Sequence, residues 1–554
     1  MTIGRRTLLR GMAATAGITG AAGAAAALGA VEAAATASRA GAARPPGTGA
    51  ARAGRRPARS GGTTRNPTLD ADFAALAAGL DGRLVRPGDP DYPVARLLYQ
   101  PRYDAVAPAA VAYPAHDRDV ATCVAFARRS GIPVVPRGGG HSYAGWSTGT
   151  GLVVDVGALD RLVVSTGTGT GTGTAQLGAG LRLGDLHAGL AARGAAVPAG
   201  LCPSVGIAGL ALGGGLGVTS RAYGTTSDHL TGLRIVTADG RIRDTDAQQD
   251  PDLFWALRGA GGGSFGVVTE FRFRTRPVSD CAFVELHWRW RDAGALLRAW
   301  QRWQAELPDP FWSQAEFTIE SGAPPGPVVR VVCLDGLREL ENRLTRLADL
   351  AGAPPRDSFT VVRGYGETMR AMSGCLDLSP AQCRLPGELP GRDPQGRLGR
   401  DDYAARSDFW PAGGLPGAAL DAVLAGVARY ASTAVRGGRG VVQFDGVCGG
   451  AVNRVPAADT AFVHRDSAFL AQYLAYWPAG ASRAEVDRQR GWLDRLWTDL
   501  RVWAGGSAYQ NYADPALSTW ADAYYGTNLA RLRQVKRAYD PEELFRFPQG
   551  VRPL

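Results

Sequence analysis

The feature that most constrains this chain is a set of three glycine clusters, at 138–140, 213–217 and 261–266. Because glycine has no Cβ, such segments let the backbone turn tightly and approach a ligand closely. Successive backbone N–H groups in such turns cradle anions such as a pyrophosphate. None of the three is needed by an ordinary core, and one alone would be weak evidence. Three of them, separated by helices and strands, predict a large cofactor held against the backbone.

The chain is long enough for at least two lobes, since 554 residues exceed what one hydrophobic core usually holds. Residues 110–137 read as strand, helix and strand, with Asp117 or Asp119 as the helix cap, which indicates an α/β lobe. Hairpins are predicted around the Thr-Gly repeat at 166–174 and at Asp239-Gly240. After Pro277, alternating strands and amphipathic helices predict a second lobe over 278–504.

The N-terminus has the features of an export signal. Arg5-Arg6 precedes an alanine-rich apolar stretch from Gly11 to Val31, and small-residue triplets follow it. Residues 1–40 are therefore expected to be a bacterial twin-arginine signal peptide that leads to secretion, the alternative being a disordered basic tail. The stretch is too weakly hydrophobic to be a stable membrane span. Residues 41–68, rich in Ala, Arg, Gly and Pro, are expected to be a disordered linker.

Cysteine spacing and charge exclude some classes of protein. The seven cysteines show no C-x-x-C spacing, so no metal site is expected. Cys375 and Cys383 bracket a short Pro-containing loop and are the best candidates for a disulfide.

The formal net charge of +10 is carried almost wholly by arginine. It fits a composition bias more simply than a steering field for an anionic substrate, and no basic–aromatic run indicates nucleic-acid binding.

Two reactive side chains stand beside the glycine clusters. His141 ends the first cluster, and Cys202 shortly precedes the second. Taken singly, each is expected to be structural, a polar loop histidine and a buried thiol. Taken together they point to chemistry, because imidazole and thiolate are the two common side-chain nucleophiles able to bond to an electrophilic cofactor ring.

These segments carry a resemblance to a known family. The stretches "RGGGHSYAG", "GLCPSVGIAGLALGGGLGVTSRAYGTTSDHL", "GSFGVVTEF", "VHR" at 463–465 and "YQNY" at 509–512 resemble the berberine bridge enzyme-like family. This is a branch of the vanillyl-alcohol oxidase superfamily of flavoproteins, with a PCMH-type FAD-binding domain. The resemblance covers roughly residues 90–554 and implies an α+β fold. In it, a two-subdomain FAD-binding fold carries an inserted substrate domain whose antiparallel sheet is covered by helices.

The resemblance also implies domain limits and a cofactor. The FAD-binding domain would span 90–277, the substrate-binding domain 278–504, and a C-terminal segment over 505–554 would complete the FAD domain. FAD would be attached twice, through His141 to the 8α carbon and through Cys202 to position 6 of the ring. The other positions that match cofactor-binding residues of the family are Arg137, Gly138, Gly139, Gly140, Ser142, Val205, Gly206, Gly209, Gly214, Gly217, Asp228, Gly266, Val268, Asn511 and Tyr512.

Five residues match catalytic or site-lining positions of the family. Tyr509 matches the catalytic tyrosine that serves as base, and Asp445 falls where members carry an acid or amide on a strand facing the flavin. Gln443, two positions earlier, would face the same side of that strand. His464, Tyr143 and Tyr223 match further positions at the site. Each has a structural alternative: packing for Tyr509, a loop carboxylate for Asp445, a buried hydrogen-bonder for His464, and a cavity wall for the two remaining tyrosines.

The implied reaction is transfer of a hydride from a C–H bond of the substrate to flavin N5, with a base removing the hydroxyl proton. The expected substrate is a small molecule, an alcohol or a sugar hemiacetal. Val205 matches a position where valine goes with oxidases, which implies O₂ as acceptor and H₂O₂ as product. The alternatives are an oxidative cyclase or desaturase of natural products, a dehydrogenase with another acceptor, and a flavin carrier without catalysis. The sequence leaves the substrate and the oligomeric state open.

Overall fold

A small sheet is built by the segment that leads into the first glycine cluster. The computed structural model describes residues 67–167, 172–278, 280–335, 337–433 and 435–554. Apolar runs at 110–113, 134–137 and 152–155 form parallel strands, with α5 between the first two, as predicted. The sheet order is β1-β2-β4-β3. The elements are β1 (Arg83–Val85), β2 (Ala110–Tyr113), α5 (Asp117–Ser130), β3 (Val134–Arg137) and β4 (Leu152–Asp155), preceded by α3 (Pro67–Ala78) and α4 (Tyr92–Ala95).

The predicted signal at 1–40 lies outside the described residues. The predicted linker at 41–68 does too, except that its last residues belong to α3, which begins at Pro67. The tip of the predicted Thr-Gly hairpin at 168–171 is likewise outside them. Its flanking strands pair as expected, with Ser165 opposite Thr174.

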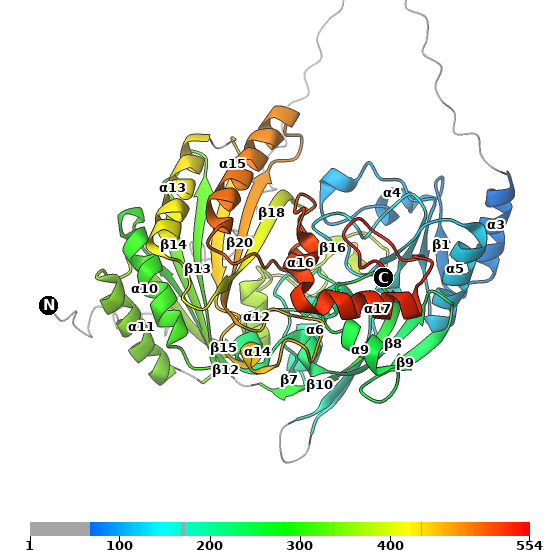
Figure 1. Ribbon diagram of the computed structural model, residues 1–554, viewed down its shortest axis with the longest axis horizontal. Coiled ribbons are helices and arrows are strands. Elements are labelled where there is room, and N and C mark those ends of the chain that lie inside the picture. Colours follow the sequence, from blue (N-terminus) through cyan, green and yellow to red (C-terminus); the bar gives the residue numbers. More distant parts are fainter. Residues whose placement is uncertain (1–66, 168–171, 279, 336, 434) are drawn as a thin grey trace, which may run out of the picture.

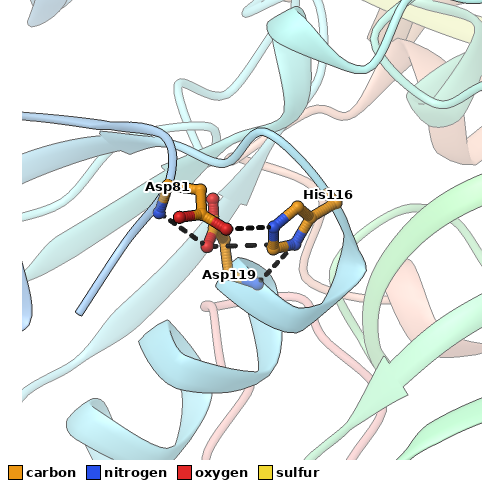
Figure 2. A group of neighbouring side chains, drawn as sticks. All are labelled: Asp81, His116 and Asp119. Atoms are coloured by element: carbon orange, nitrogen blue, oxygen red, sulfur yellow. Dashed lines mark hydrogen bonds and ion pairs between the residues drawn. The ribbon is translucent and has the colours of Figure 1, made fainter.

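The start of α5 differs from the prediction (Figure 2). The cap is His116, whose Nδ1 accepts the Asp119 N–H at 3.3 Å. The Asp119 carboxylate instead accepts three N–H groups of the preceding turns, those of Asp81, Gly82 and Ala115. His116 Nε2 lies 2.8 Å from Asp81 Oδ2, and this hydrogen bond raises the pKa of His116. Because these atoms are engaged within the chain, the cluster fastens the turn at 81–82 to the helix.

A five-stranded antiparallel sheet follows, in the order β5-β6-β10-β8-β9. The predicted hairpin at Asp239-Gly240 is confirmed: β8 and β9 pair, and Gly240 turns with φ +80°. Buried side chains of both sheets and of the C-terminal residues 508–551 share one hydrophobic core. The elements are β5 (Leu162–Ser165), β6 (Thr174–Gly178), α6 (Leu183–Ala191), α7 (Ile207–Leu212), α8 (Ser220–Tyr223), β8 (Leu230–Thr237), β9 (Ile242–Thr245), α9 (Pro251–Ala256), β10 (Gly266–Arg274), α16 (Trp520–Tyr525) and α17 (Leu529–Tyr539).

The region after Pro277 forms a seven-stranded antiparallel sheet, in the order β15-β12-β14-β13-β19-β20-β18. Four helices lie side by side across one face (Figure 1), which confirms the α+β fold with an antiparallel sheet covered by helices. The strands are β12 (Asp280–His287), β13 (Phe311–Glu320), β14 (Gly326–Cys333), β15 (Asp357–Gly364), β18 (Asp402–Pro411), β19 (Arg439–Asp445) and β20 (Ser467–Trp477), and the helices α10 (Ala293–Ala305), α11 (Leu337–Ala351), α13 (Gly417–Thr433) and α15 (Arg483–Arg501).

Side chains alternate between the two faces of this sheet, as the strand period of two requires. Ala315, Val331 and Phe444 belong to the core under the helices. Their neighbours Gln314, Arg330 and Gln443 line a cavity on the opposite face. Gln314, Arg330 and Gln443 therefore all point the same way, into the cavity that the glycine clusters also line.

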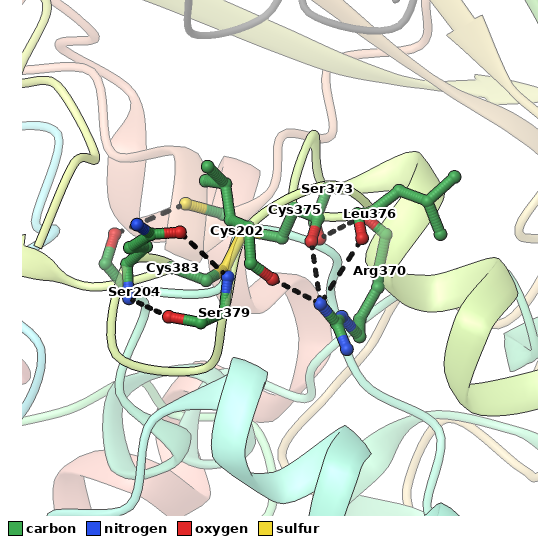
Figure 3. The surroundings of a disulfide bond; sticks show 10 residues. Cys202, Ser204, Arg370, Ser373, Cys375, Leu376, Ser379 and Cys383 are labelled. Atoms are coloured by element: carbon green, nitrogen blue, oxygen red, sulfur yellow. Dashed lines mark hydrogen bonds between the residues drawn. A yellow bond between two sulfur atoms is a disulfide. The ribbon is translucent and has the colours of Figure 1, made fainter. Parts of the chain in front are cut away.

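A loop over 373–400 links the sheet to the cavity wall and carries the predicted disulfide. Cys375 and Cys383 are bonded, which confirms that pairing (Figure 3). Arg370 donates to backbone carbonyls of the loop, including Cys375 O at 3.1 Å. The remaining short elements are β7 (Ala195–Ala196), β11 (Arg276–Pro277), α12 (Tyr365–Met372), β16 (Leu385–Pro386), β17 (Arg392–Asp393) and α14 (Ala451–Arg454). No helix in the described part of the chain is long and apolar enough to cross a bilayer.

Candidate active site

A cavity of about 980 Å³ separates the glycine clusters from the polar face of the seven-stranded sheet. All three clusters contribute to its lining, together with the stretch 509–513 of the C-terminal segment. The volume suits a large cofactor and a small substrate together, since ligand pockets usually measure about 300–1,000 Å³.

The glycine clusters form a bare backbone cradle on one wall of the cavity. A Cβ placed on Gly139 would lie 2.2 Å from Gly206 N, so these two loops touch through their backbones and only glycine fits. At Gly209 and Gly261, by contrast, a Cβ would meet no atom within 4 Å and would project into the space that both residues line. A backbone left bare toward an open cavity is what close approach of a cofactor requires. The cradle therefore fits the pyrophosphate-containing FAD that the sequence implies.

His141 and Cys202 lie on this same wall, on either side of one serine hydroxyl. His141 Nε2 lies 2.9 Å from Ser204 Oγ, and Cys202 Sγ lies 3.7 Å from the same oxygen (Figure 3 shows the second contact). The imidazole also stacks on the ring of Tyr99, with centroids 4.1 Å apart. Burial, and then the nearby Arg182, lower the pKa of His141 to about 3, so the imidazole is neutral.

Tyr509 closes the cavity beside the second glycine cluster. Its hydroxyl oxygen accepts hydrogen bonds from Gly215 N at 3.1 Å and from Asn511 Nδ2 at 2.9 Å. Burial raises the pKa of Tyr509 strongly, and the two donors oppose that effect only in part. Tyr509 lines the cavity, so a ligand bound there can reach this side chain.

Two amide side chains of the sheet face meet Tyr143, which lies in the loop after the first glycine cluster. Gln472 Nε2 donates to Tyr143 Oη at 2.9 Å, and Gln443 Nε2 donates to Gln472 Oε1 at 3.0 Å. Burial raises the pKa of Tyr143 to about 12. Tyr143 also stacks on Tyr512, with centroids 5.2 Å apart. The predicted pair Gln443 and Asp445 does line one side of β19.

Asp445 is an ionisable group of this face with a pKa near neutrality. Burial raises its pKa to about 7, although Trp312 donates to Asp445 Oδ1 at 2.6 Å and opposes the shift. A carboxyl group with such a pKa exchanges a proton readily near neutral pH.

Four predicted site residues do not reach the cavity. His464 is stacked on Phe409, with centroids 4.1 Å apart, and Phe409 in turn contacts the Tyr509 ring. Tyr223 lies under Arg276. Asp228 is held by two hydrogen bonds from Arg465, and although burial raises its pKa, these bonds bring the net value below the usual range. Gly214 faces the Phe462 ring, 2.5 Å from where its Cβ would be.

Arg137 lines the cavity, but its guanidinium already forms an ion pair with a buried carboxylate. Its Nε lies 2.8 Å from Asp155 Oδ2, and its Nη2 donates to the Ala95 carbonyl at 2.7 Å. The guanidinium therefore braces the loop, and the backbone N–H groups of the glycine clusters are the candidates for phosphate binding. The remaining predicted cofactor positions all line the cavity, and they are Gly138, Gly139, Gly140, Ser142, Val205, Gly206, Gly209, Gly217, Gly266, Val268, Asn511 and Tyr512.

Sequence reasoning missed a charged cluster at the far end of the sheet face. Arg330 contacts Glu285 at 2.7 Å and Glu316 at 2.8 Å, and it also donates to Gln314 at 3.2 Å. Arg330, Glu316 and Gln314 line the cavity, as does Gln472. A single charged or amide residue within an otherwise apolar strand, as in "PVVRVVC" and "FLAQYLAYW", was the signal that would have identified them.

A backbone cradle for FAD, two candidate tethering nucleophiles and an ionisable group opposite them define a flavoprotein oxidoreductase. The family described as "FAD binding domain" matches residues 108–246, and the family described as "Berberine and berberine like" matches residues 508–552. An uncharacterised FAD-linked oxidoreductase of Bacillus subtilis is 30% identical over 484 residues, which cover 86% of this chain and 98% of the relative. The chain belongs to the berberine bridge enzyme-like family of FAD-linked oxidoreductases, as its motifs predicted.

Solved structures agree with this assignment. BBE-like 1 of Physcomitrella patens is 29% identical, with a TM-score of 0.75 over 86% of this chain and 98% of that one. A glucooligosaccharide oxidase of Acremonium strictum is 25% identical, with a TM-score of 0.74 over 87% of this chain and 99% of that one. The latter is described as carrying a 6-S-cysteinyl, 8α-N1-histidyl FAD.

Proposed function

We propose that this enzyme carries FAD bound through both His141 and Cys202 and oxidises an alcohol or the hemiacetal carbon of a sugar, with O₂ as the electron acceptor. The observation that carries the proposal is the placement of both side chains on one cavity wall, around a single hydroxyl oxygen. The doubly attached FAD of the glucooligosaccharide oxidase supports it.

When bound, FAD supplies the hydride acceptor at N5 and returns the electrons to O₂ as H₂O₂. The chain must then bind the substrate hydroxyl and take its proton. The pKa of about 7 favours Asp445 for this role. The strongly raised pKa of Tyr509 makes it a better hydrogen-bond donor than base.

The cavity favours a hydroxyl-rich substrate over an apolar one. Amide, carboxylate and guanidinium groups follow one another across the sheet face, from Gln472 through Gln443 to Glu316 and Arg330. Such groups have donor and acceptor positions beyond those used in their mutual hydrogen bonds, and sugar hydroxyls can pair with these positions, whereas an apolar substrate cannot. This favours a sugar over the natural-product cyclase and desaturase alternatives.

Two further proposals concern the electron acceptor and the destination of the protein. Val205, a small side chain that lines the cavity next to Gly206, supports access of O₂ and hence oxidase rather than dehydrogenase behaviour. The Arg5-Arg6 pair and the apolar segment after it support export of the folded protein by the twin-arginine machinery.

The test combines the cofactor and the reaction. The purified protein is precipitated with acid and digested, and mass spectrometry of the peptides that contain positions 141 and 202 detects bound flavin. Soluble enzyme is screened for H₂O₂ release with mono- and oligosaccharides and with simple alcohols. We expect a yellow precipitate, flavin mass on both peptides, and peroxide with sugars. A colourless precipitate with both peptides unmodified would refute the proposal, and oxidation that proceeds only with an artificial acceptor would refute the oxidase part.

A further inference from the structure

We propose that Ser204 is a positioning residue that orients both His141 and Cys202 for bond formation with FAD. The inference rests on the proposed doubly attached cofactor and adds a residue to which the sequence assigned no role. Its basis is geometric, because the Ser204 hydroxyl oxygen is a hydrogen-bond partner of both side chains. It lies 2.9 Å from His141 Nε2 and 3.7 Å from Cys202 Sγ.

The backbone around Ser204 is fixed, so the hydroxyl is held in place. The side chain is only 4% exposed. Two residues further on, Gly206 lies in backbone contact with Gly139 of the histidine loop and forms a β-bridge with Arg182. The cysteine loop and the histidine loop are thus locked together immediately beside the hydroxyl. Tyr99, whose N–H donates to Gly140 O at 3.1 Å, limits rotation of the imidazole by stacking on it.

In the proposed arrangement, His141 has the tautomer in which Nε2–H donates to Ser204 Oγ. A neutral imidazole carries one N–H, and its other nitrogen has the free lone pair. If Nε2–H donates to Ser204 Oγ, the lone pair is on Nδ1, away from the serine. The hydroxyl proton of Ser204 is then available to the Cys202 sulfur, where a donated hydrogen bond favours the reactive thiolate form. One serine, accepting from the imidazole and donating to the sulfur, thereby prepares both nucleophiles.

The chemistry that Ser204 prepares is oxidative at both sites. At the first, the neutral imidazole and the ring methyl group form an N–C bond while one N–H and one C–H bond break. At the second, the thiol and the ring C6–H form an S–C bond while the S–H and C–H bonds break. Each attachment releases two electrons and two protons, and one O₂ accepts them to give one H₂O₂. Oxygen is the acceptor already required by the proposed function.

The test uses two substitutions of the same shape, Ser204→Thr and Ser204→Val, which differ only in the hydroxyl. Each protein is produced with limited riboflavin, incubated with FAD in air, and sampled over time. Acid precipitation separates covalent from non-covalent flavin, and peptide masses report occupancy at 141 and 202. Ser227→Ala is the matched control, because Ser227 is a buried serine of the neighbouring loop that bonds Thr225 and does not line the cavity.

We expect Ser204→Thr and Ser227→Ala to attach flavin like the wild type. Ser204→Val should still bind FAD but attach it at least about 10-fold more slowly at both positions, the usual size of a lost orienting contact. Equal rates of flavin attachment in Ser204→Val and Ser204→Thr would overturn the inference, whether both rates are fast or both are slow. Failure of Ser204→Val to fold, where Ser204→Thr folds, would overturn it too. If the wild type itself attaches no flavin, the proposed function fails instead, which keeps the two failures distinct.

Discussion

At the scale of single residues, the raised pKa of Asp445 leads to a prediction about pH. A base must be ionised to accept a proton, so activity that depends on Asp445 is lost as the pH falls through its pKa of about 7. We expect kcat/KM of the wild type to fall tenfold per pH unit below that value. Asp445→Asn should lower kcat/KM by about 10²–10⁴-fold near neutrality and remove this acid limb. The measurement is the pH profile of peroxide release on an active sugar.

Tyr509→Phe provides the comparison for that experiment. It removes a hydroxyl that touches the cavity but leaves the Asp445 carboxyl in place, so its rate should fall while the acid limb stays near pH 7. If the limb instead persists in Asp445→Asn and disappears in Tyr509→Phe, the base is Tyr509, as the sequence alone suggested.

Lys536 is the only lysine of the chain, and every other strongly basic side chain is an arginine. Its side chain is fully buried, and Nζ donates to Ser264 O at 2.6 Å, to Asp540 Oδ2 at 2.6 Å and to Phe545 O at 2.7 Å. Three acceptors around one nitrogen suit a compact ammonium and not the planar fork of arginine. Ser264 belongs to the third glycine cluster, so this lysine fastens the cluster to the C-terminal segment.

We therefore expect Lys536→Met to destabilise the protein by about 3–5 kcal/mol, because it leaves Asp540 buried without its partner. Lys536→Arg should also destabilise it, despite keeping the charge. The midpoint of urea unfolding measures both. Arg537→Met, at the neighbouring exposed position, is the control and should stay within about 0.5 kcal/mol of the wild type. A Lys536→Arg variant as stable as the wild type would show that the geometry does not matter.

At the scale of elements, we predict that Gly209 in α7 makes room for the cofactor and lowers the stability of the helix. Glycine within a helix costs about 0.5–1 kcal/mol relative to alanine, and a Cβ at Gly209 would meet no protein atom. Gly209→Leu should therefore leave the flavin-free protein at least as stable as the wild type, yet abolish flavin binding by filling the cradle. Gly491→Leu on α15, another helical glycine with open space beside it, should leave flavin binding unchanged.

Thermal unfolding of flavin-free protein and the flavin absorbance of reconstituted protein give the two readouts. Normal flavin content in Gly209→Leu would mean that the cofactor does not approach α7. A loss of stability in the flavin-free variant would mean that the space beside Gly209 is not available to a side chain.

The elements also show how far the sequence could predict this molecule. Local patterns sufficed for the β-α-β segment, the two hairpins and the side of β19 that carries Gln443 and Asp445, because helix and strand periods decide which face a residue takes. They did not suffice for Asp228 or Ser204. Asp228 is held by Arg465, 237 positions away, and Ser204 meets His141, 63 positions away. Contacts across such separations depend on how elements pack, which one sequence does not specify.

At the scale of the whole molecule, the proposed cofactor is a covalent cross-link as well as a catalyst. His141 and Cys202 lie in different loops. His141 follows β3, and Cys202 precedes α7. They are about 60 residues apart, and joining residues at that separation lowers the entropy of the unfolded chain by an amount equivalent to about 4 kcal/mol. A flavin bonded at both positions should thus act on stability as a disulfide would.

We predict that the flavin-loaded wild type melts about 4 °C above both His141→Ala and Cys202→Ala variants that keep the flavin through their remaining bond. The two variants should resemble each other, since either substitution opens the same loop. Differential scanning calorimetry of loaded and flavin-free protein makes the comparison. In the flavin-free state all three should melt together, because no cross-link is present in any of them. A gap of equal size without flavin would assign the loss to packing of the two side chains. Equal melting of all three loaded proteins would show that the second bond adds no constraint on the unfolded chain, so its contribution would lie in the ring chemistry.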